Sequence, residues 1–237
     1  MKPTSKSEEN KIDLATVNKS KKQLKLPEIK NPLTPMKLSV QHLQYAWNRQ
    51  TPDWESRLNK FTQTMIEQID TLSVIATEFS DFAKMPATRK ETVNVIDIIQ
   101  TAVSLFKNYE NIAITINSAA TSVLVFSDKD QLLRAFNNLI KNSVQAIGHK
   151  TGGTIHIEVK LTHDQCIIEL SDNGEGIPPE LSDKIFSPYF TTKTSGMGLG
   201  LAIVKSIIVN SDGEISYTSE QGKGTVFTIC IPLIERA

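Results

Sequence analysis

Two glycine-rich segments and a pair of asparagines are the residues of this sequence whose types and spacing could do chemistry. The first segment contains Asp172, Gly174 and Gly176 and directly follows a strand-like run. It therefore places a carboxylate at a strand end, beside backbone that can approach a flat ligand closely. A tight turn would explain the same glycines equally well, so this segment alone is a weak signal.

The second segment contains Gly196, Gly198 and Gly200 and leads into a helical pattern. Its amides, together with the N-terminus of the following helix, could receive the oxygens of a phosphate group. A hinge in front of an ordinary helix is the alternative. The loop that joins the two segments, residues 172–200, is long for a connector, which favours a binding loop or a lid.

Asn138 and Asn142 lie four residues apart in a predicted helix and therefore share one of its faces. An amide oxygen suits Mg²⁺, which takes few protein ligands and completes its shell with phosphates and water. A structural hydrogen bond to a neighbouring loop is the alternative explanation for each asparagine.

In order and spacing, these segments resemble the successive sequence boxes of the histidine kinase ATPase domain. The matching segments are residues 138–142, 172–176, 185–193, 196–200 and 222–225. This ATP-binding fold is shared with gyrase, heat-shock chaperone and mismatch-repair ATPases, and the resemblance covers about residues 92–232. It implies that ATP and Mg²⁺ are the cofactors.

The resemblance also implies a role for each matching residue. Asp172 would bind the adenine amino group, Gly174 and Gly176 would form the wall beside the base, and Thr225 would support the adenine end. Asn142 would bind Mg²⁺, and Asn138 would line the same site. The phosphates would contact Gly196, Gly198 and Gly200. Phe186, Phe190 and Lys193 fall in the lid, where Lys193 is expected to approach phosphate when the lid closes. The two aromatic residues could simply anchor that lid.

The residue at position 138 indicates which branch of this superfamily the chain resembles. The hydrolysing relatives place a glutamate there to orient and deprotonate water, and the amide of Asn138 cannot act as that base. The resemblance therefore favours phosphotransfer over the ATP-hydrolysing machines of the gyrase or chaperone kind.

Two amphipathic helices are predicted before this domain. Apolar residues recur at alternating three- and four-residue steps over about residues 27–49, and again from Trp54 for about 30 residues until the chain reaches Pro86. A lone hairpin would leave part of each apolar stripe in water, so a homodimeric four-helix bundle is expected. Packing of the hairpin on its own C-terminal domain is the alternative.

The first of these helices resembles the phosphoacceptor helix of sensor kinases, most nearly that of the nitrogen-regulation type, over residues 28–39. In that family a histidine precedes the glutamate, whereas here Pro27 precedes Glu28. Proline has no nucleophile, so self-phosphorylation at this position is expected to be lost. Glu28 and Asn31 remain as the catalytic candidates, with Asn31 matching the residue on which removal of phosphate from the regulator relies.

The departure at Pro27 leaves three explanations open: a natural pseudo-kinase, an engineered variant, or a truncation with a foreign N-terminal piece. None of the four histidines is expected to replace the acceptor: they are His42, His149, His156 and His163. A proline is structurally harmless here only if it lies in the first helical turn, where its missing N–H is not needed.

The predicted fold class is α+β, with the helical hairpin followed by a two-layer α/β sandwich in which helices cover one face of the sheet. Residues 1–23 are polar and lysine-rich and are expected to form a flexible tail, residues 24–88 the hairpin, and residues 89–237 the ATP-binding domain. In that domain, strands are expected at 92–95, 112–117, 123–126, 154–162, 165–171, 214–219 and 225–231, and helices at 96–109, up to 147, and 198–209.

Composition adds several expectations about partners and location. Acidic and basic residues balance at 26 each among the 237 residues, which gives no reason to expect nucleic acid or an anionic membrane as a partner. Cys166 and Cys230 lie in apolar alternating runs, which favours buried reduced thiols and a cytoplasmic location. No stretch of the chain is long and apolar enough to span a bilayer, and membrane segments in a longer parent protein stay open.

Together these patterns predict the cytoplasmic transmitter core of a two-component sensor kinase, with a response regulator receiver domain as its partner. The main alternative is a non-catalytic, ATP-gated module that docks a regulator without turnover. The signal sensed and the identity of the regulator do not follow from the sequence.

Overall fold

The computed structural model describes residues 27–49, 53–83, 88–192 and 198–234 of the chain. The chain forms two compact units, Met1–Lys84 and Met85–Ala237. The predicted tail, residues 1–23, lies outside the described residues, as do Lys193 and Gly196.

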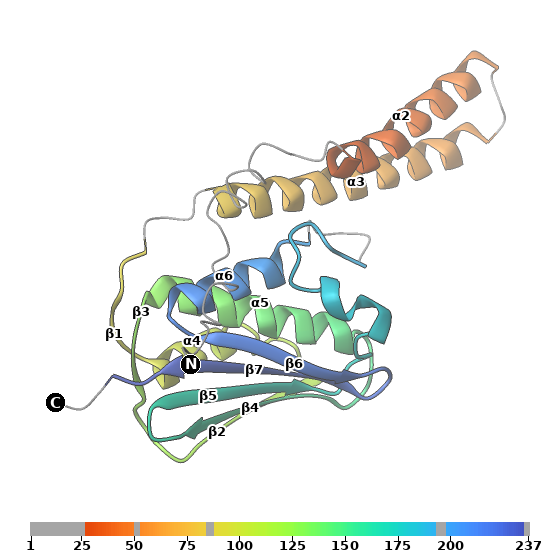
Figure 1. The fold of residues 1–237 in the computed structure, drawn as a ribbon. Helices are drawn as coiled ribbons and strands as arrows, with labels where there is room; N and C mark the ends of the chain where they lie inside the picture. Colours follow the sequence, from red (N-terminus) through yellow and green to blue (C-terminus); the bar gives the residue numbers. More distant parts are fainter. Residues whose placement is uncertain (1–26, 50–52, 84–87, 193–197, 235–237) are drawn as a thin grey trace. The chain divides into compact units, whose positions relative to one another are not determined.

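The first unit is a hairpin of two helices, α2 (Pro27–Asn48) and α3 (Trp54–Ala83), packed against each other (Figure 1). Near the turn, the rings of Trp47 and Trp54 lie 5.0 Å apart between centroids and tie the two helix ends together. These bounds confirm the two helices predicted from the apolar stripes.

The start of α2 explains how its prolines are accommodated. Pro27 is the first helical residue, so its missing N–H falls where no intrahelical bond would form. Pro32 and Pro35 lie inside α2, and each removes one amide donor from the helix. The condition under which Pro27 is structurally harmless is therefore met.

The second unit carries the remaining helices and strands. In chain order they are β1 (Glu91–Asn94), α4 (Val95–Ser104), β2 (Ile112–Ser118), β3 (Leu124–Ser127), α5 (Lys129–Ile147), β4 (Gly153–Leu161), β5 (Gln165–Asp172), the 3-10 helix η1 (Pro179–Lys184), α6 (Gly200–Asn210), β6 (Glu214–Glu220) and β7 (Gly224–Pro232).

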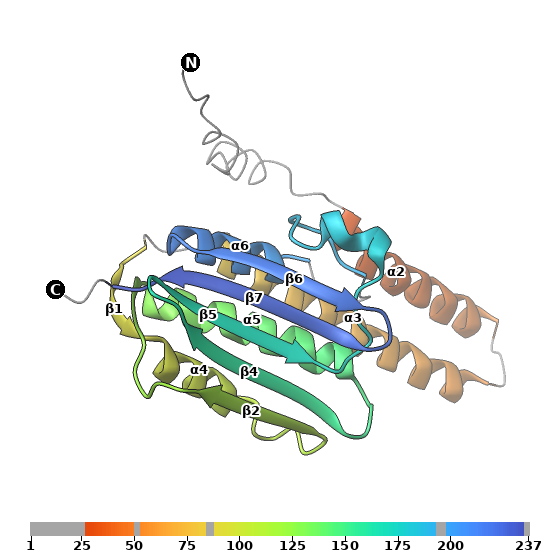
Figure 2. The same ribbon diagram turned by 60° about the horizontal axis from the view of Figure 1, so that its bottom comes forward.

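Five strands form one mixed sheet in the order β2-β4-β5-β7-β6, and β1 pairs with β3 in a separate two-stranded sheet. Within the larger sheet β2 and β4 are parallel and the other neighbours are antiparallel. The helices α4, α5 and α6 lie on one face of this sheet (Figures 1 and 2). The predicted α+β class and the closing hairpin of β6 and β7 are confirmed.

Local signals explain the bounds of α5, which carries several of the candidate site residues. The side chain of Asp128 accepts a hydrogen bond from the amide of Gln131 and so caps the helix N-terminus. Gly148, with φ of 58°, ends it. The fully buried Leu132, Phe136, Leu139 and Ile140 form its core face.

The prediction for α4 was too long. The sequence pattern predicted a helix over residues 96–109, whereas α4 ends at Ser104 and the chain turns before β2. Leu105 and Tyr109 are exposed by 62% and 49% of their surface, so these apolar residues do not continue the buried stripe. Pairing of Ile112 with Gly153 on β4 requires the chain to reverse within these few residues.

The two cysteines are free thiols on neighbouring strands. Burial raises the pKa of the Cys166 thiol to about 12, and nearby Cys230 adds to that shift. Burial also raises the pKa of Cys230. Both thiols are therefore protonated at neutral pH and are poor nucleophiles.

Within the described residues, no helix has the length and apolar character needed to cross a membrane.

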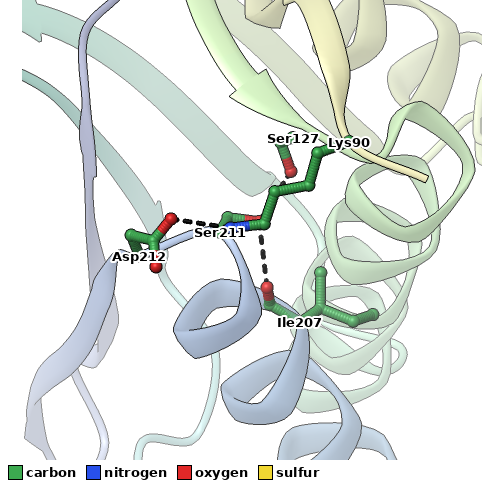
Figure 3. A network of polar contacts seen from close by, with 5 residues as sticks. All are labelled: Lys90, Ser127, Ile207, Ser211 and Asp212. Atoms are coloured by element: carbon green, nitrogen blue, oxygen red, sulfur yellow. Dashed lines mark hydrogen bonds and ion pairs between the residues drawn. The ribbon is translucent and has the colours of Figure 1, made fainter. Parts of the chain in front are cut away.

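A polar network fastens the C-terminal end of α6 to the segment that enters the second unit (Figure 3). The hydroxyls of Ser127 on β3 and Ser211 lie 2.6 Å apart, and Ser211 Oγ donates to the carbonyl of Ile207 at 3.0 Å. Because that donation uses the only proton of the Ser211 hydroxyl, Ser127 donates to Ser211. Lys90 Nζ, from the segment before β1, donates to Asp212 Oδ2 at 2.6 Å.

The direction of these bonds predicts unequal effects for two similar substitutions. Ser211→Ala removes the partner of the fully buried Ser127 hydroxyl and should lower the free energy of unfolding by about 1–3 kcal/mol. Ser127→Ala leaves Ser211 bonded to Ile207 and should cost about 1 kcal/mol or less. Urea unfolding followed by circular dichroism compares the two variants. Equal losses, or a larger loss for Ser127→Ala, would contradict this direction.

Candidate nucleotide-binding site

Asp172 is the last residue of β5, and three donors converge on its carboxylate. The amides of Gly174 and Thr225 donate to Oδ1 at 2.9 and 3.3 Å, and Ser143 Oγ donates to Oδ2 at 2.8 Å. These bonds fix the orientation of the carboxylate. Lone pairs that they leave can accept a hydrogen bond from a ligand, because an ionised carboxylate accepts about four.

Ser143 is a site residue that the sequence interpretation missed. It lies on α5 directly after Asn142 and is only 1% exposed. A polar residue on an otherwise apolar helix face was the available signal, but its partner Asp172 is 29 residues further along the chain. Local periodicity does not reveal such a pair.

The backbone beyond Asp172 runs close to the end of α5 and to the β6–β7 turn. The amide of Glu175 donates to the carbonyl of Ala146 at 3.0 Å, and the amide of Gly222 donates to the carbonyl of Glu175 at 2.7 Å. Gly176 has φ of 70°, and a Cβ there would collide with the Glu220 carbonyl oxygen. Both the backbone conformation and the lack of space for a side chain therefore require glycine at position 176. This is one of the two glycines predicted to lie beside the base.

The second glycine-rich segment meets α5 near the middle of the helix. Gly200 is the first residue of α6, and a Cβ there would lie 3.7 Å from Asn138 Oδ1. Leu199 at the N-cap has no polar side chain, so it cannot satisfy the first amides of α6. These amides, next to the Asn138 side chain, are suited to phosphate oxygens.

A single face of α5 therefore connects the two glycine-rich segments. Asn138 adjoins Gly200, while Ala146, eight residues later, adjoins Gly174, where an added Cβ would lie 2.8 Å from the Ala146 Cβ. At 1.5 Å per residue these two contacts are about 12 Å apart along the helix. Such a spacing suits an elongated ligand with a planar group at the Asp172 end and anionic groups at the α6 end.

The long loop between these segments is closed at its base and held along its first half. Gly198 has φ of 65°, and a Cβ there would collide with the Phe190 carbonyl, so the two sides of the loop touch. The ring of Phe186 lies 6.0 Å from that of Tyr217 on β6, and Lys205 Nζ of α6 lies 5.6 Å from the centroid of Phe186. These contacts favour the anchoring alternative for Phe186.

The asparagine amides fit a Mg²⁺ ion that is bound mainly through a nucleotide. Among the residues that the structure describes, no group of three or more His, Cys, Asp or Glu side chains could hold a metal ion. Mg²⁺ bound with a nucleotide needs only one or two protein oxygens in addition to phosphates and water. Asn138 and Asn142 carry such oxygens on the half-buried face of α5, and Asn138 adjoins the first residue of α6.

Comparison with known proteins agrees with this arrangement. The family model of the histidine kinase-, DNA gyrase B- and HSP90-like ATPases matches residues 127–235. The solved catalytic domain of the histidine kinase ThkA is 31% identical, and the match covers 61% of this chain and 96% of that domain with a TM-score of 0.56. The chain belongs to the sensor histidine kinase family. The resemblance inferred from the sequence motifs is thus confirmed.

Curated relatives extend the similarity into the hairpin. The sensor histidine kinase ZraS of Salmonella typhimurium is 36% identical over 213 residues, which covers 88% of this chain and 44% of ZraS. Sporulation kinase B of Bacillus subtilis is 34% identical, with 86% of this chain and 47% of that kinase covered. The chain therefore spans a little under half the length of these relatives.

One solved structure matches both units of this kinase chain. The crystal structure of ThkA in complex with the response regulator protein TrrA covers 94% of the chain with a TM-score of 0.70 and 24% identity. At that identity it supports the fold, including a helical hairpin before the ATPase domain. In the present chain Asn31 is an exposed residue of α2.

Proposed function

We propose that the chain is the transmitter core of a two-component sensor kinase, which binds Mg-ATP for signalling to a response regulator. The observation that carries the proposal is a pair of contacts along the C-terminal half of α5. Asp172 is bonded to Ser143 toward the end of the helix, and Gly200 adjoins Asn138 near its middle. An ATP molecule laid along this face has its adenine and its phosphates at the matching ends.

The individual roles follow the family resemblance and the local chemistry. Asp172 accepts from the adenine amino group, with Gly174 and Gly176 beside the base and Thr225 at the same end. Gly198 and Gly200 contribute phosphate-binding amides, joined by Gly196, while Lys193 approaches phosphate from the lid. Asn142 holds Mg²⁺, and Asn138 lines the same site. When bound, the ion neutralises phosphate charge, while these residues orient the triphosphate and exclude water.

The asparagine at position 138 supports transfer over hydrolysis. A neutral amide can orient a group by hydrogen bonding, but it cannot take a proton from water at neutral pH. Water at this position would therefore not be activated, which keeps bound ATP available for transfer. An ATP-hydrolysing conformational machine is disfavoured for this reason.

A homodimer is proposed from the surface of the hairpin. Several large apolar side chains on α2 and α3 are exposed within the single chain: Leu33, Leu38, Val40, Tyr45, Trp47, Leu58, Ile66 and Ile69. Trp47 is 65% exposed and Tyr45 54% exposed. So many exposed large apolar side chains on one hairpin favour an interface, and a second hairpin would complete a four-helix bundle.

A receiver domain is the proposed partner, and the chain acts on the cytoplasmic side where such partners occur. ThkA, whose fold matches both units, was crystallised with a response regulator protein. Because Pro27 stands at the acceptor position, we further propose that self-phosphorylation is lost. Asn31, one helical turn on, can still orient water against the acyl phosphate of a docked regulator, because positioning by an amide needs no covalent intermediate.

The phosphatase part of the proposal is tested by mixing the chain with a receiver domain phosphorylated by acetyl phosphate. The receiver is chosen by its binding to the chain in sedimentation experiments. We expect the phosphoryl label to decay about tenfold faster with the chain than in buffer, because water is oriented for attack. Asn31→Ala should return the decay to the buffer rate.

Asn48→Ala, at the opposite end of α2 and also exposed, is the matched control and should keep the full rate. Equal decay with the chain, with Asn31→Ala and with buffer would exclude the phosphatase. Together with retained receiver binding, that outcome would favour the non-catalytic docking module.

A further inference from the structure

Ser219 ties together three backbone segments at the adenine end of the site. It lies on β6 directly opposite Thr225 on β7, and Thr225 lies opposite Asp172 on β5. The three residues therefore form one row across three adjacent strands. Thr225 is 4% exposed and Ser219 is half-buried, so their hydroxyl groups have little access to bulk water.

The contacts of the Ser219 hydroxyl determine its direction of donation. Its oxygen accepts from the Ile177 amide at 2.8 Å, and it lies 2.9 Å from both the Gly224 carbonyl and the Thr225 hydroxyl. A carbonyl can only accept, so the single Ser219 proton satisfies Gly224. Without it, two acceptor oxygens would face each other at 2.9 Å. The Thr225 hydroxyl must then donate to Ser219.

This direction leaves the Thr225 oxygen with lone pairs only. The neighbouring Asp172 carboxylate is also purely an acceptor, since its three protein contacts are all donors. The row accordingly presents acceptors, and no side-chain proton, toward a base that lies beside Asp172.

We propose that Ser219 is a specificity-determining positioning residue, which holds the Thr225 hydroxyl as an acceptor and so selects 6-amino purines over 6-oxo purines. The inference rests on the proposed placement of the adenine at Asp172. A 6-amino group donates two protons, which the acceptors can receive directly or through a water molecule. A 6-oxo group is an acceptor and meets acceptors, which is repulsive in a site of low water access.

Removing the Ser219 hydroxyl should change the selectivity in a defined way. In Ser219→Ala the Thr225 hydroxyl loses its acceptor and can rotate, so that it donates toward a 6-oxo group. The Ile177 amide and the Gly224 carbonyl also lose a partner. We therefore expect weaker ATP binding and relatively stronger binding of a 6-oxo purine nucleotide.

The test is titration calorimetry of the full chain with ATP and with inosine triphosphate. The two nucleotides share the ribose and triphosphate and differ only at C6 and in the proton on N1, so the ratio of their affinities reports recognition of that edge of the base. Wild type should prefer ATP, and Ser219→Ala should lower that preference by about tenfold, in line with one rearranged buried hydrogen bond. Ser219→Thr keeps a hydroxyl at this position and should keep the wild-type preference for ATP.

Two further variants test whether a change in the affinity ratio comes from the Ser219–Thr225 hydrogen bond. Ser216→Ala changes an exposed serine of the same strand, outside this row, and should match wild type. Thr225→Val removes the hydroxyl while leaving the bonds of Ser219 to Ile177 and Gly224, so it should lower the preference even if Ser219→Ala folds poorly. Circular dichroism checks the fold of each variant.

An unchanged affinity ratio in Ser219→Ala and Thr225→Val would overturn the inference, whether or not both affinities fall together. Equal binding of the two nucleotides by wild type would also overturn it while leaving nucleotide binding intact. A wild-type chain that binds neither nucleotide would overturn the proposed function, and with it this inference.

Discussion

Asp172→Asn is expected to weaken ATP binding by about a hundredfold, which corresponds to about 3 kcal/mol. The carboxylate receives donors on both oxygens: two amides on Oδ1 and the Ser143 hydroxyl on Oδ2. An asparagine side chain has a single acceptor oxygen, so its NH₂ group would face either the two backbone amides or the Ser143 hydroxyl, which would then have to accept instead of donate. It would also lose the charged acceptor that the adenine amino group is proposed to use.

Titration calorimetry with ATP measures this effect, and circular dichroism checks that the variant is folded. Asp183→Asn, an exposed residue of η1, is the matched control and should bind like wild type. Ser143→Ala should show a smaller loss than Asp172→Asn, because it removes one of the three donors and leaves the acceptor. Unchanged ATP affinity in Asp172→Asn would refute the placement of the adenine at this strand end.

The sequence predicted most elements of the second unit because their signals are local. Three local features define α5. Asp128 caps its N-terminus, Gly148 follows its last residue, and Leu132 and Phe136 lie on its apolar face. The alternation of β6 and β7 around a glycine-containing turn predicted their hairpin. In each case the side chains that determine the element lie within a few residues of one another.

The strand order and the hydrogen bonds of the site were not predictable in the same way. Alternation indicates which side chains face the core but not which strand lies beside which, so the insertion of β7 between β5 and β6 had no local signal. The bond from Ile177 to Ser219 joins residues 42 positions apart. The pairing of β2 with β4, which follows the early end of α4, likewise joins residues about 40 positions apart.

The motifs, in contrast, predicted a candidate site because a nucleotide requires particular residue types. Glycine at position 176 is demanded by a positive φ and by contact with Glu220, and such demands are visible in sequence. Ser143 and Ser219 were missed because serine at a strand or helix position is common. Only the position of their partners distinguishes them from ordinary polar residues.

Pro27→His is expected to convert the chain from one that takes no label from γ-labelled ATP into one that does. Position 27 is the first residue of α2, so a histidine there falls immediately before Glu28, as in the kinases that the helix resembles. A ring nitrogen would attack the γ-phosphorus while the bond to the bridging oxygen breaks and ADP leaves. The ring proton would pass to the Glu28 carboxylate, the general base that the resemblance implies, and then to solvent.

The label incorporated by Pro27→His should exceed background by about a hundredfold or more, because a nucleophile and its general base are then both present. It should be stable in alkali and lost in acid, as a phosphoramidate is. A chelator added with the ATP should suppress it if Mg²⁺ is bound as proposed.

Two variants separate the missing nucleophile from the effect of proline on the helix. Pro27→Ala relieves the backbone restriction without supplying a nucleophile and should remain unlabelled. Pro27→His combined with Asp172→Asn should also remain unlabelled, because the ATP-binding site is then impaired. If wild type and Pro27→Ala are labelled as strongly as Pro27→His, another residue accepts the phosphoryl group and position 27 is not the acceptor site. If Pro27→His stays unlabelled while it still binds ATP, the lost histidine is not the only change that separates this chain from an active kinase.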